Sequence, residues 1–100
     1  MKILLIDDNP ILEIHSIKGD RLISINEILY IKAQDKGSII HLLDNDFIET
    51  RYLLNLFCNV LPTPYYFRCH KSYIINCIFV DCHTYSEVIL KENERIPFQR

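Results

Sequence analysis

Short apolar runs separated by polar turns dominate the first half of the chain. Residues 11–17 and 22–25 alternate loosely between apolar and polar side chains, and residues 28–31 form a continuous apolar run. Alternation predicts strands with one buried face, and a continuous run suits a strand covered on both faces. Polar segments at 18–21 and 34–37, each with a glycine, predict the turns between them. The pattern therefore predicts a meander of antiparallel strands.

Two further hairpins are predicted, at residues 38–50 and 87–98. Their turns fall at Asp-Asn (44–45) and Glu-Asn (92–93). Asp and Asn accept left-handed backbone, so a tight turn at 44–45 is expected. The apolar residues 78–80 predict one more short strand.

Residues 51–61 break the strand pattern and predict a helix. Apolar side chains fall at i, i+4 and i+7, with two more beside them: Leu53, Phe57 and Val60, then Leu54 and Leu61. Such a stripe is typical of a helix with one buried face. Pro62 and Pro64 predict its end. The residues thus indicate one helix embedded among about seven to nine short strands.

The length and composition of the chain describe a single globular domain. It has 100 residues, of which 49% are apolar, enough for one core. No stretch reaches the ~20 apolar residues that a membrane span needs. The apolar run at the start breaks at Asp7 and Asp8, too early for a signal peptide. We therefore expect a cytoplasmic protein with no membrane partner.

Net charge alone does not indicate a nucleic-acid partner, because it is −2. The distribution of charge changes this picture. Residues 1–50 hold five Lys and Arg against nine Asp and Glu, whereas residues 51–100 hold six against four. A local basic face on a mildly acidic protein is compatible with phosphate binding.

The chain has four cysteines: Cys58, Cys69, Cys77 and Cys82. No pair has C-x-x-C spacing, and their spacing with the histidines fits no common zinc module. Cysteine and histidine are neighbours at 69–70 and 82–83, but neighbouring side chains on a strand point to opposite faces, which disfavours a nucleophile–base relay. We expect reduced thiols in or near the core, no cofactor, no metal site and no enzymatic activity.

The stretch 67–76 concentrates basic and aromatic side chains. Alternation along an extended segment places Arg68 and His70 on one side and Cys69 and Lys71 on the other. One side could face a phosphate while the other packs, and a solvated strand edge remains the simpler interpretation of the residues alone. Asn76 would then be a turn residue.

Three blocks of sequence, in order, resemble the LytTR family from about residue 11 to residue 100. Residues 25–33 (INEILYIKA) are similar to a strand of the family that ends in ILYIEA. Residues 67–76 (FRCHKSYIIN) are similar to its core pattern F-x-R-x-H-[RN]-S-[YF]-[IV]-[IV]-N, and residues 96–100 (IPFQR) to its closing I-P-V-S-R. The second block is quite specific, and the predicted helix lies between the first two.

The resemblance implies both a fold and a function. The fold class would be mainly β, with about seven to ten short, mostly antiparallel strands in small stacked sheets and one embedded helix. The function would be sequence-specific binding of double-stranded DNA by a bacterial transcriptional regulator, with loops entering successive grooves. Two protomers on spaced direct repeats are expected. The predicted DNA-binding residues are Lys36, Ser38, Arg68, Lys71, Ser72, Asn76 and Arg100.

Side-chain chemistry divides the work among these residues. Arg100 can donate a bidentate pair of hydrogen bonds to guanine in the major groove. Lys36 and Lys71 are flexible point charges suited to phosphate. The hydroxyl and amide groups of the set can bond phosphate or base edges, or cap turns instead. For His70 we favour a packed, hydrogen-bonded role over a DNA contact.

The resemblance also bears on the organisation of the chain. Residues 1–10 look like the first strand and acidic pair of a response-regulator receiver domain, but they are not a complete domain, so the DNA-binding domain is assigned to 11–100. An upstream receiver domain or a histidine-kinase pathway is the expected regulatory partner. The alternative is a protein–protein interaction module that has lost DNA binding, which the net charge favours.

Cys69 raises the question of redox control. Some family members resemble redox-responsive regulators with a cysteine at this position, whose partner cysteine lies where this chain has Arg95. The intramolecular disulfide is therefore expected to be missing here. We expect Cys69 to be a small buried side chain, and mild peroxide to leave DNA affinity unchanged.

Overall fold

The structure is a computed structural model that describes residues 2–6, 9–62 and 65–98. These residues form eleven strands, one α-helix and four single 3₁₀ turns. The strands are β1 (Lys2–Ile6), β2 (Asn9–Ser16), β3 (Gly19–Ser24), β4 (Ile28–Gln34), β5 (Gly37–Leu42), β6 (Phe47–Thr50), β7 (Tyr66–His70), β8 (Tyr73–Asn76), β9 (Val80–His83), β10 (Glu87–Leu90) and β11 (Glu94–Pro97). The helix is α1 (Leu54–Val60), and the 3₁₀ turns are η1 (Ile25–Glu27), η2 (Leu43–Asn45), η3 (Cys77–Phe79) and η4 (Lys91–Asn93). The mainly β fold class with one embedded helix is confirmed.

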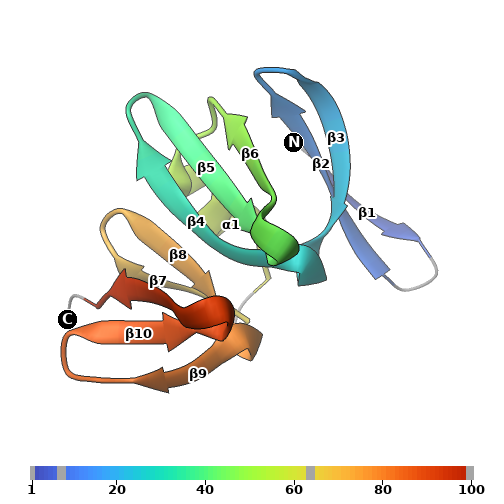
Figure 1. Ribbon diagram of the computed structural model, residues 1–100. Coiled ribbons are helices and arrows are strands. Elements are labelled where there is room, and N and C mark those ends of the chain that lie inside the picture. Colours follow the sequence, from blue (N-terminus) through green and yellow to red (C-terminus); the bar gives the residue numbers. More distant parts are fainter. Residues whose placement is uncertain (1, 7–8, 63–64, 99–100) are drawn as a thin grey trace.

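The strands form two antiparallel sheets. The large sheet has the order β1-β2-β6-β5-β4-β8-β7, and β3 pairs with β2 outside this path. The small sheet has the order β11-β10-β9. Strand β2 joins β6 through a single residue pair, Ser16 with Thr50. As Figure 1 shows, β1–β3 stand to one side of β4–β6, and the small sheet lies beside β7 and β8.

Two apolar clusters fill the fold, and β4 contributes to both. Ile28 and Ile31 belong to the cluster that packs around Phe57 of α1. Leu29 and Tyr30 belong to the cluster formed with the small sheet. All four side chains of this run are buried, which confirms a strand covered on both faces.

The helix is shorter than predicted, and its buried stripe is shifted. It begins at Leu54, because Leu53 has extended backbone and serves as the N-cap without a side-chain hydrogen bond. The Leu53 side chain is 58% exposed, whereas Leu54, Phe57 and Leu61 are buried. The buried positions are therefore i, i+3 and i+7 counted from Leu54, and the prediction that Leu53 packs inside was wrong.

Both predicted hairpin turns are confirmed by their backbone angles. Asp44 and Asn45 have φ of 63° and 61°, and Glu92 and Asn93 have φ of 69° and 60°. The short strand predicted at 78–80 was placed too early: Cys77–Phe79 is the 3₁₀ turn η3, and the strand β9 begins at Val80. The residues of η3 are apolar but do not form a strand, because the Asn76 side chain caps the turn by accepting a hydrogen bond from the Ile78 N–H.

Polar contacts join the two sheets where η2 meets η4. The Asp44 N–H donates to the Glu92 carboxylate at 3.2 Å, and the Tyr30 hydroxyl donates to the Glu94 carboxylate at 3.5 Å. His41 stacks on Tyr30 with ring centroids 4.3 Å apart. Burial lowers the pKa of His41, although Glu94 opposes the change. We call these five residues the seam.

Candidate nucleic-acid interface

Several turns gather at one end of the large sheet. Thr50 at the end of β6 pairs with both Ser16 of β2 and Ser38 of β5, and Lys32 of β4 pairs with Tyr73 of β8. This register brings the β2–β3, β4–β5 and β7–β8 turns and the segment before α1 to the same end. Figure 1 shows the β4–β5 and β7–β8 turns on the same side of the molecule. The exposed basic side chains of these turns and of the adjoining β7 form what we call the basic end: Lys18, Lys36, Arg51, Arg68 and Lys71.

The β4–β5 turn is shaped by one aspartate and one glycine. Asp35 has φ of 50°, a conformation that Asp tolerates better than most residues. Gly37 is needed because a Cβ at this position would lie 2.1 Å from the Thr50 carbonyl oxygen and 2.9 Å from the Arg51 Cα. The turn is thus pressed directly against the end of β6, and Lys36 at its tip is exposed.

Ser38 does not present its hydroxyl to a ligand. The residue is only 2% exposed, and its hydroxyl donates to the Tyr52 carbonyl oxygen at 2.7 Å. This bond ties β5 to the segment that leads into α1. Among the alternatives left open by the sequence, the structure favours the structural role for Ser38.

Arg68 connects the helix to the β7–β8 turn. Its Nη1 donates to the Asn55 side-chain oxygen at 2.7 Å, and its Nη2 donates to the Lys71 carbonyl oxygen at 2.6 Å. The guanidinium has five N–H donors, so donors remain after these two bonds. Arg68 therefore positions the backbone that carries Lys71 and stays exposed itself.

The β7–β8 turn is fixed mainly through its backbone. The Ser72 N–H donates to His70 Nδ1 at 3.1 Å, and the Ser72 carbonyl accepts from the Ala33 N–H at 2.8 Å. The His70 ring also meets Tyr73 edge-on at 5.7 Å. His70 is half-buried and hydrogen-bonded, in agreement with its predicted packed role. Lys71 at the tip is exposed.

A shallow depression of about 170 Å³ joins the two predicted DNA-binding turns. Asp35 and Gly37 line it from the β4–β5 turn, Arg68 and Lys71 from the β7–β8 turn, and Asn55 from α1. Of the residues predicted to bind DNA, Arg68 and Lys71 line this depression, and Lys36 stands between two residues that line it, Asp35 and Gly37.

Asn76 lies in the core. It is 1% exposed, and its amide donates to the Ile28 carbonyl at 2.9 Å and to the Tyr66 hydroxyl at 3.3 Å. Its side-chain oxygen accepts from the Ile78 N–H at 3.3 Å and so caps η3. Because all these groups are bonded within the fold, the structure favours a structural role for Asn76.

Arg100 lies outside the described residues, and its predicted base contact stays a prediction. The last described segment runs beside β7. The Cys69 thiol donates to the Pro97 carbonyl at 3.6 Å, and the Phe67 and Phe98 rings meet edge-on at 6.2 Å.

Cys69 is a buried thiol rather than a reactive one. It is 1% exposed, and burial raises its pKa to about 11. The thiolate is the reactive form of cysteine, so this environment suppresses reaction near neutral pH. None of the four cysteines forms a disulfide, and the other three are exposed, so the expectation of thiols in or near the core holds for Cys69 alone. The expected small buried side chain is confirmed, and the response to peroxide stays a prediction.

Lys18 and Arg51 were not among the predicted site residues. The β2–β3 turn was predicted, but the contact that brings it to the basic end is the pairing of Ser16 with Thr50, which no local pattern reveals. Within the described part of the chain, no cation of the basic end pairs with a carboxylate. Elsewhere Arg21 pairs with Asp46, and Arg95 with Glu87, both at 3.2 Å.

Two absences hold for the described residues. They contain no cluster of three or more His, Cys, Asp or Glu side chains arranged to hold a metal ion. None of their helices has the length and apolar character needed to cross a membrane.

Comparison with known proteins adds to this geometry. The transcriptional regulatory protein YpdB of Escherichia coli is 31% identical over 65 residues, and so is that of Shigella flexneri. The match covers 63% of this chain and 26% of each regulator. A solved LytTr DNA-binding domain from Bacillus cereus superposes with a TM-score of 0.76 and 22% identity, covering 89% of this chain and 85% of that one. This last likeness concerns the fold.

The match to a family description is broader. Residues 18–100 match the LytTr DNA-binding domain, a span that includes all of the basic end and both sheets except β1 and β2. Because the match extends over most of the chain and agrees with the fold, the chain belongs to the LytTr DNA-binding domain family.

Proposed function

We propose that the basic end binds a specific sequence of duplex DNA, as the output domain of a bacterial transcriptional regulator. The observation that carries this proposal is the gathering of five exposed cations at one end of the sheet. In the described residues none of them is neutralised by a carboxylate. Phosphate contacts supply most of the affinity of such proteins. An unneutralised row of cations on a member of this family suits that task.

Different residues contact the phosphates, which position the domain on DNA, and the bases, which carry the sequence. Lys36 and Lys71 stand at the tips of two neighbouring turns and bind phosphates on either side of a groove. Ser72 and Arg68 support the second turn, and the donors that Arg68 keeps free can reach a phosphate. Arg100 reads guanine through a bidentate hydrogen bond. Ser38 and Asn76 hold the fold beneath this surface.

The proposal extends to the wider setting of the domain, which the family resemblance suggests. Two protomers bind spaced direct repeats, because one small surface with few cations binds weakly alone. A receiver domain or a histidine-kinase pathway supplies the signal, and the regulator works in the bacterial cytoplasm. No catalytic step is part of this proposal.

The test begins with selection of bound sequences from random duplex DNA. The selected duplex and a scrambled duplex are then titrated by fluorescence anisotropy at several salt concentrations. We expect preference for the selected duplex and a log–log salt slope of roughly −3 to −5 per protomer, since each phosphate contact contributes about −0.9. Binding that ignores salt, or no binding to any selected duplex, would contradict the proposal.

A further inference from the structure

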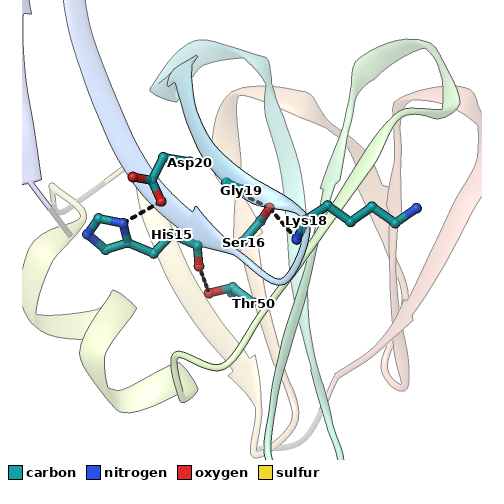
Figure 2. A network of polar contacts seen from close by, with 6 residues as sticks. All are labelled: His15, Ser16, Lys18, Gly19, Asp20 and Thr50. Atoms are coloured by element: carbon teal, nitrogen blue, oxygen red, sulfur yellow. Dashed lines mark hydrogen bonds and ion pairs between the residues drawn. The ribbon is translucent and has the colours of Figure 1, made fainter.

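The β2–β3 turn is tightly bonded within itself. The Ser16 hydroxyl donates to the Gly19 carbonyl and accepts the Lys18 N–H at 3.2 Å. His15 Nδ1 lies 2.7 Å from the Asp20 carboxylate. Gly19 has φ of +123°, which favours glycine. Figure 2 shows this network and the Lys18 side chain extending away from it. The backbone of Lys18 is therefore held in place without any use of its ammonium group.

The same turn is fixed to the basic end. The Thr50 hydroxyl donates to the His15 carbonyl at 2.9 Å (Figure 2). The Ile17 N–H donates to the Glu49 carbonyl at 3.2 Å. On the other side of β6, Gly37 lets the β4–β5 turn lie against Thr50. Neighbouring strands lie about 4.8 Å apart. Two such spacings separate β2 from β5, and each turn lies on the outer side of its strand, one between β2 and β3 and one between β4 and β5. The two turns therefore stand about three spacings, or roughly 14 Å, apart.

The charges at this place suit a phosphate backbone. Lys18 and Arg51 are exposed and have no carboxylate partner in the described part of the chain. Glu49 lines the depressions on both sides of β6, one beside Lys18 and one beside Arg51. These two cations, separated by one carboxylate, can each bind a phosphate oxygen.

We propose that Lys18 and Arg51 form a third DNA contact, on the phosphate backbone beside the base pairs that the β4–β5 turn approaches. This inference rests on the proposed function. A separation of roughly 14 Å corresponds to about four base pairs at 3.4 Å of rise per pair. The third contact therefore lengthens the footprint by about four base pairs on the side of the β2–β3 turn, and it does so independently of sequence.

The first experiment compares three single variants by anisotropy titration on the selected duplex. Lys18→Ala should weaken binding by the same factor on selected and scrambled duplexes and reduce the magnitude of the salt slope by about 0.9. Lys91→Ala is the matched control, because Lys91 is exposed in η4 beside the seam, and it should leave affinity and slope unchanged. Glu49→Gln should tighten binding, since a repelling charge is removed.

The second experiment shortens the duplex by about four base pairs at the end that the β2–β3 turn reaches, and by the same length at the other end as the control. The first truncation should abolish the difference between Lys18→Ala and the original protein, whereas the second should preserve it. A merely structural role of Lys18 would give the same deficit on both duplexes. That result, or an unchanged slope in Lys18→Ala, would overturn the third contact alone. Failure of the original protein to bind any selected duplex would overturn the proposed function with it.

Discussion

The basic end and the seam are both built from tight turns, yet they use charge in opposite ways. Asp35 at the basic end and Asp44 at the seam both have positive φ. At the seam the carboxylates of Glu92 and Glu94 accept hydrogen bonds from the fold itself. At the basic end, within the described residues, the lysines and Arg51 make no ion pair. Charge at the seam thus holds two sheets together, and charge at the basic end stays open to a ligand.

The largest expected effect comes from the core beneath the basic end. Phe57→Ala should lower the free energy of unfolding by about 3–5 kcal/mol, since a large buried side chain leaves a cavity. Denaturant unfolding measures the change. Leu53→Ala is the matched control on the same segment, and its exposed side chain should give a change below ~0.5 kcal/mol. Equal losses in the two variants would show that the helix is not anchored through Phe57.

Gly37→Ala should damage the basic end through its backbone. The added methyl group would meet the Thr50 carbonyl, so the β4–β5 turn must move away from β6. Overpacking of this kind costs about 1–3 kcal/mol, and DNA affinity should fall together with stability. Denaturant unfolding measures the stability and anisotropy titration measures the DNA affinity, both on the same preparation. A folded variant of undiminished stability would mean that the turn does not depend on this close approach.

Neutralising single cations should distinguish residues that contact phosphates from a residue that recognises a base. Lys71→Ala should weaken binding to every duplex and flatten the salt slope by about one. Arg100→Ala should lose about 1–3 kcal/mol on the selected duplex and relax the preference at one base pair. Neither change should alter the unfolding midpoint by much. Equal losses on selected and scrambled DNA for both variants would end the distinction.

A smaller effect should appear at alkaline pH on the side of the seam. Burial, with Glu94 adding to it, raises the pKa of Tyr30 from 10.0 to about 12, and burial raises that of Cys69 from 9.0 to about 11. The unfolded chain loses these protons at lower pH than the folded chain, so stability is full below pH 9 and falls as pH rises from about 9 to 12. Denaturant unfolding across this range measures the slope. Tyr30→Phe should make the fall between about pH 10 and 12 less steep and leave the onset near pH 9, whereas Lys36→Ala should change neither.

Much of the fold could be predicted because its strands follow one another in hairpins. The turn at Asp44-Asn45 could be predicted because both residue types accept left-handed backbone, and the strand at 28–31 because a continuous apolar run suits a strand covered on both faces. The register of Leu53 and Leu54 could not be predicted, since both positions fit an apolar stripe and the choice depends on which side the core occupies. The strand predicted at 78–80 begins only at Val80, because a capping bond from Asn76 holds the apolar residues before it in a 3₁₀ turn.

The candidate site divides in the same way. Lys36, Arg68 and Lys71 could be predicted as DNA-binding residues, because Arg68 and Lys71 lie in a family-like block and Lys36 lies in the loop that follows another. The sequence could not show that Ser38 and Asn76 have a structural role, because hydroxyl and amide groups can bond either a ligand or the fold. Only their burial in the structure distinguishes them from the exposed cations. Lys18 and Arg51 could not be found at all, since their proximity depends on a contact between β2 and β6.

That contact has a dynamic consequence. Beyond the Ser16–Thr50 pair, the three N-terminal strands are held to the rest of the large sheet mainly by buried side chains such as Leu12 and Ile14. Few ladder hydrogen bonds need to break for this unit to open as one body, so its amides should exchange with solvent faster than those of β4, which is flanked by β5 and β8. Each opening would move Lys18 away from the DNA while Lys36 and Lys71 stay in place. The domain would then lose one phosphate contact and keep the others, so its DNA affinity would fall in part and not completely.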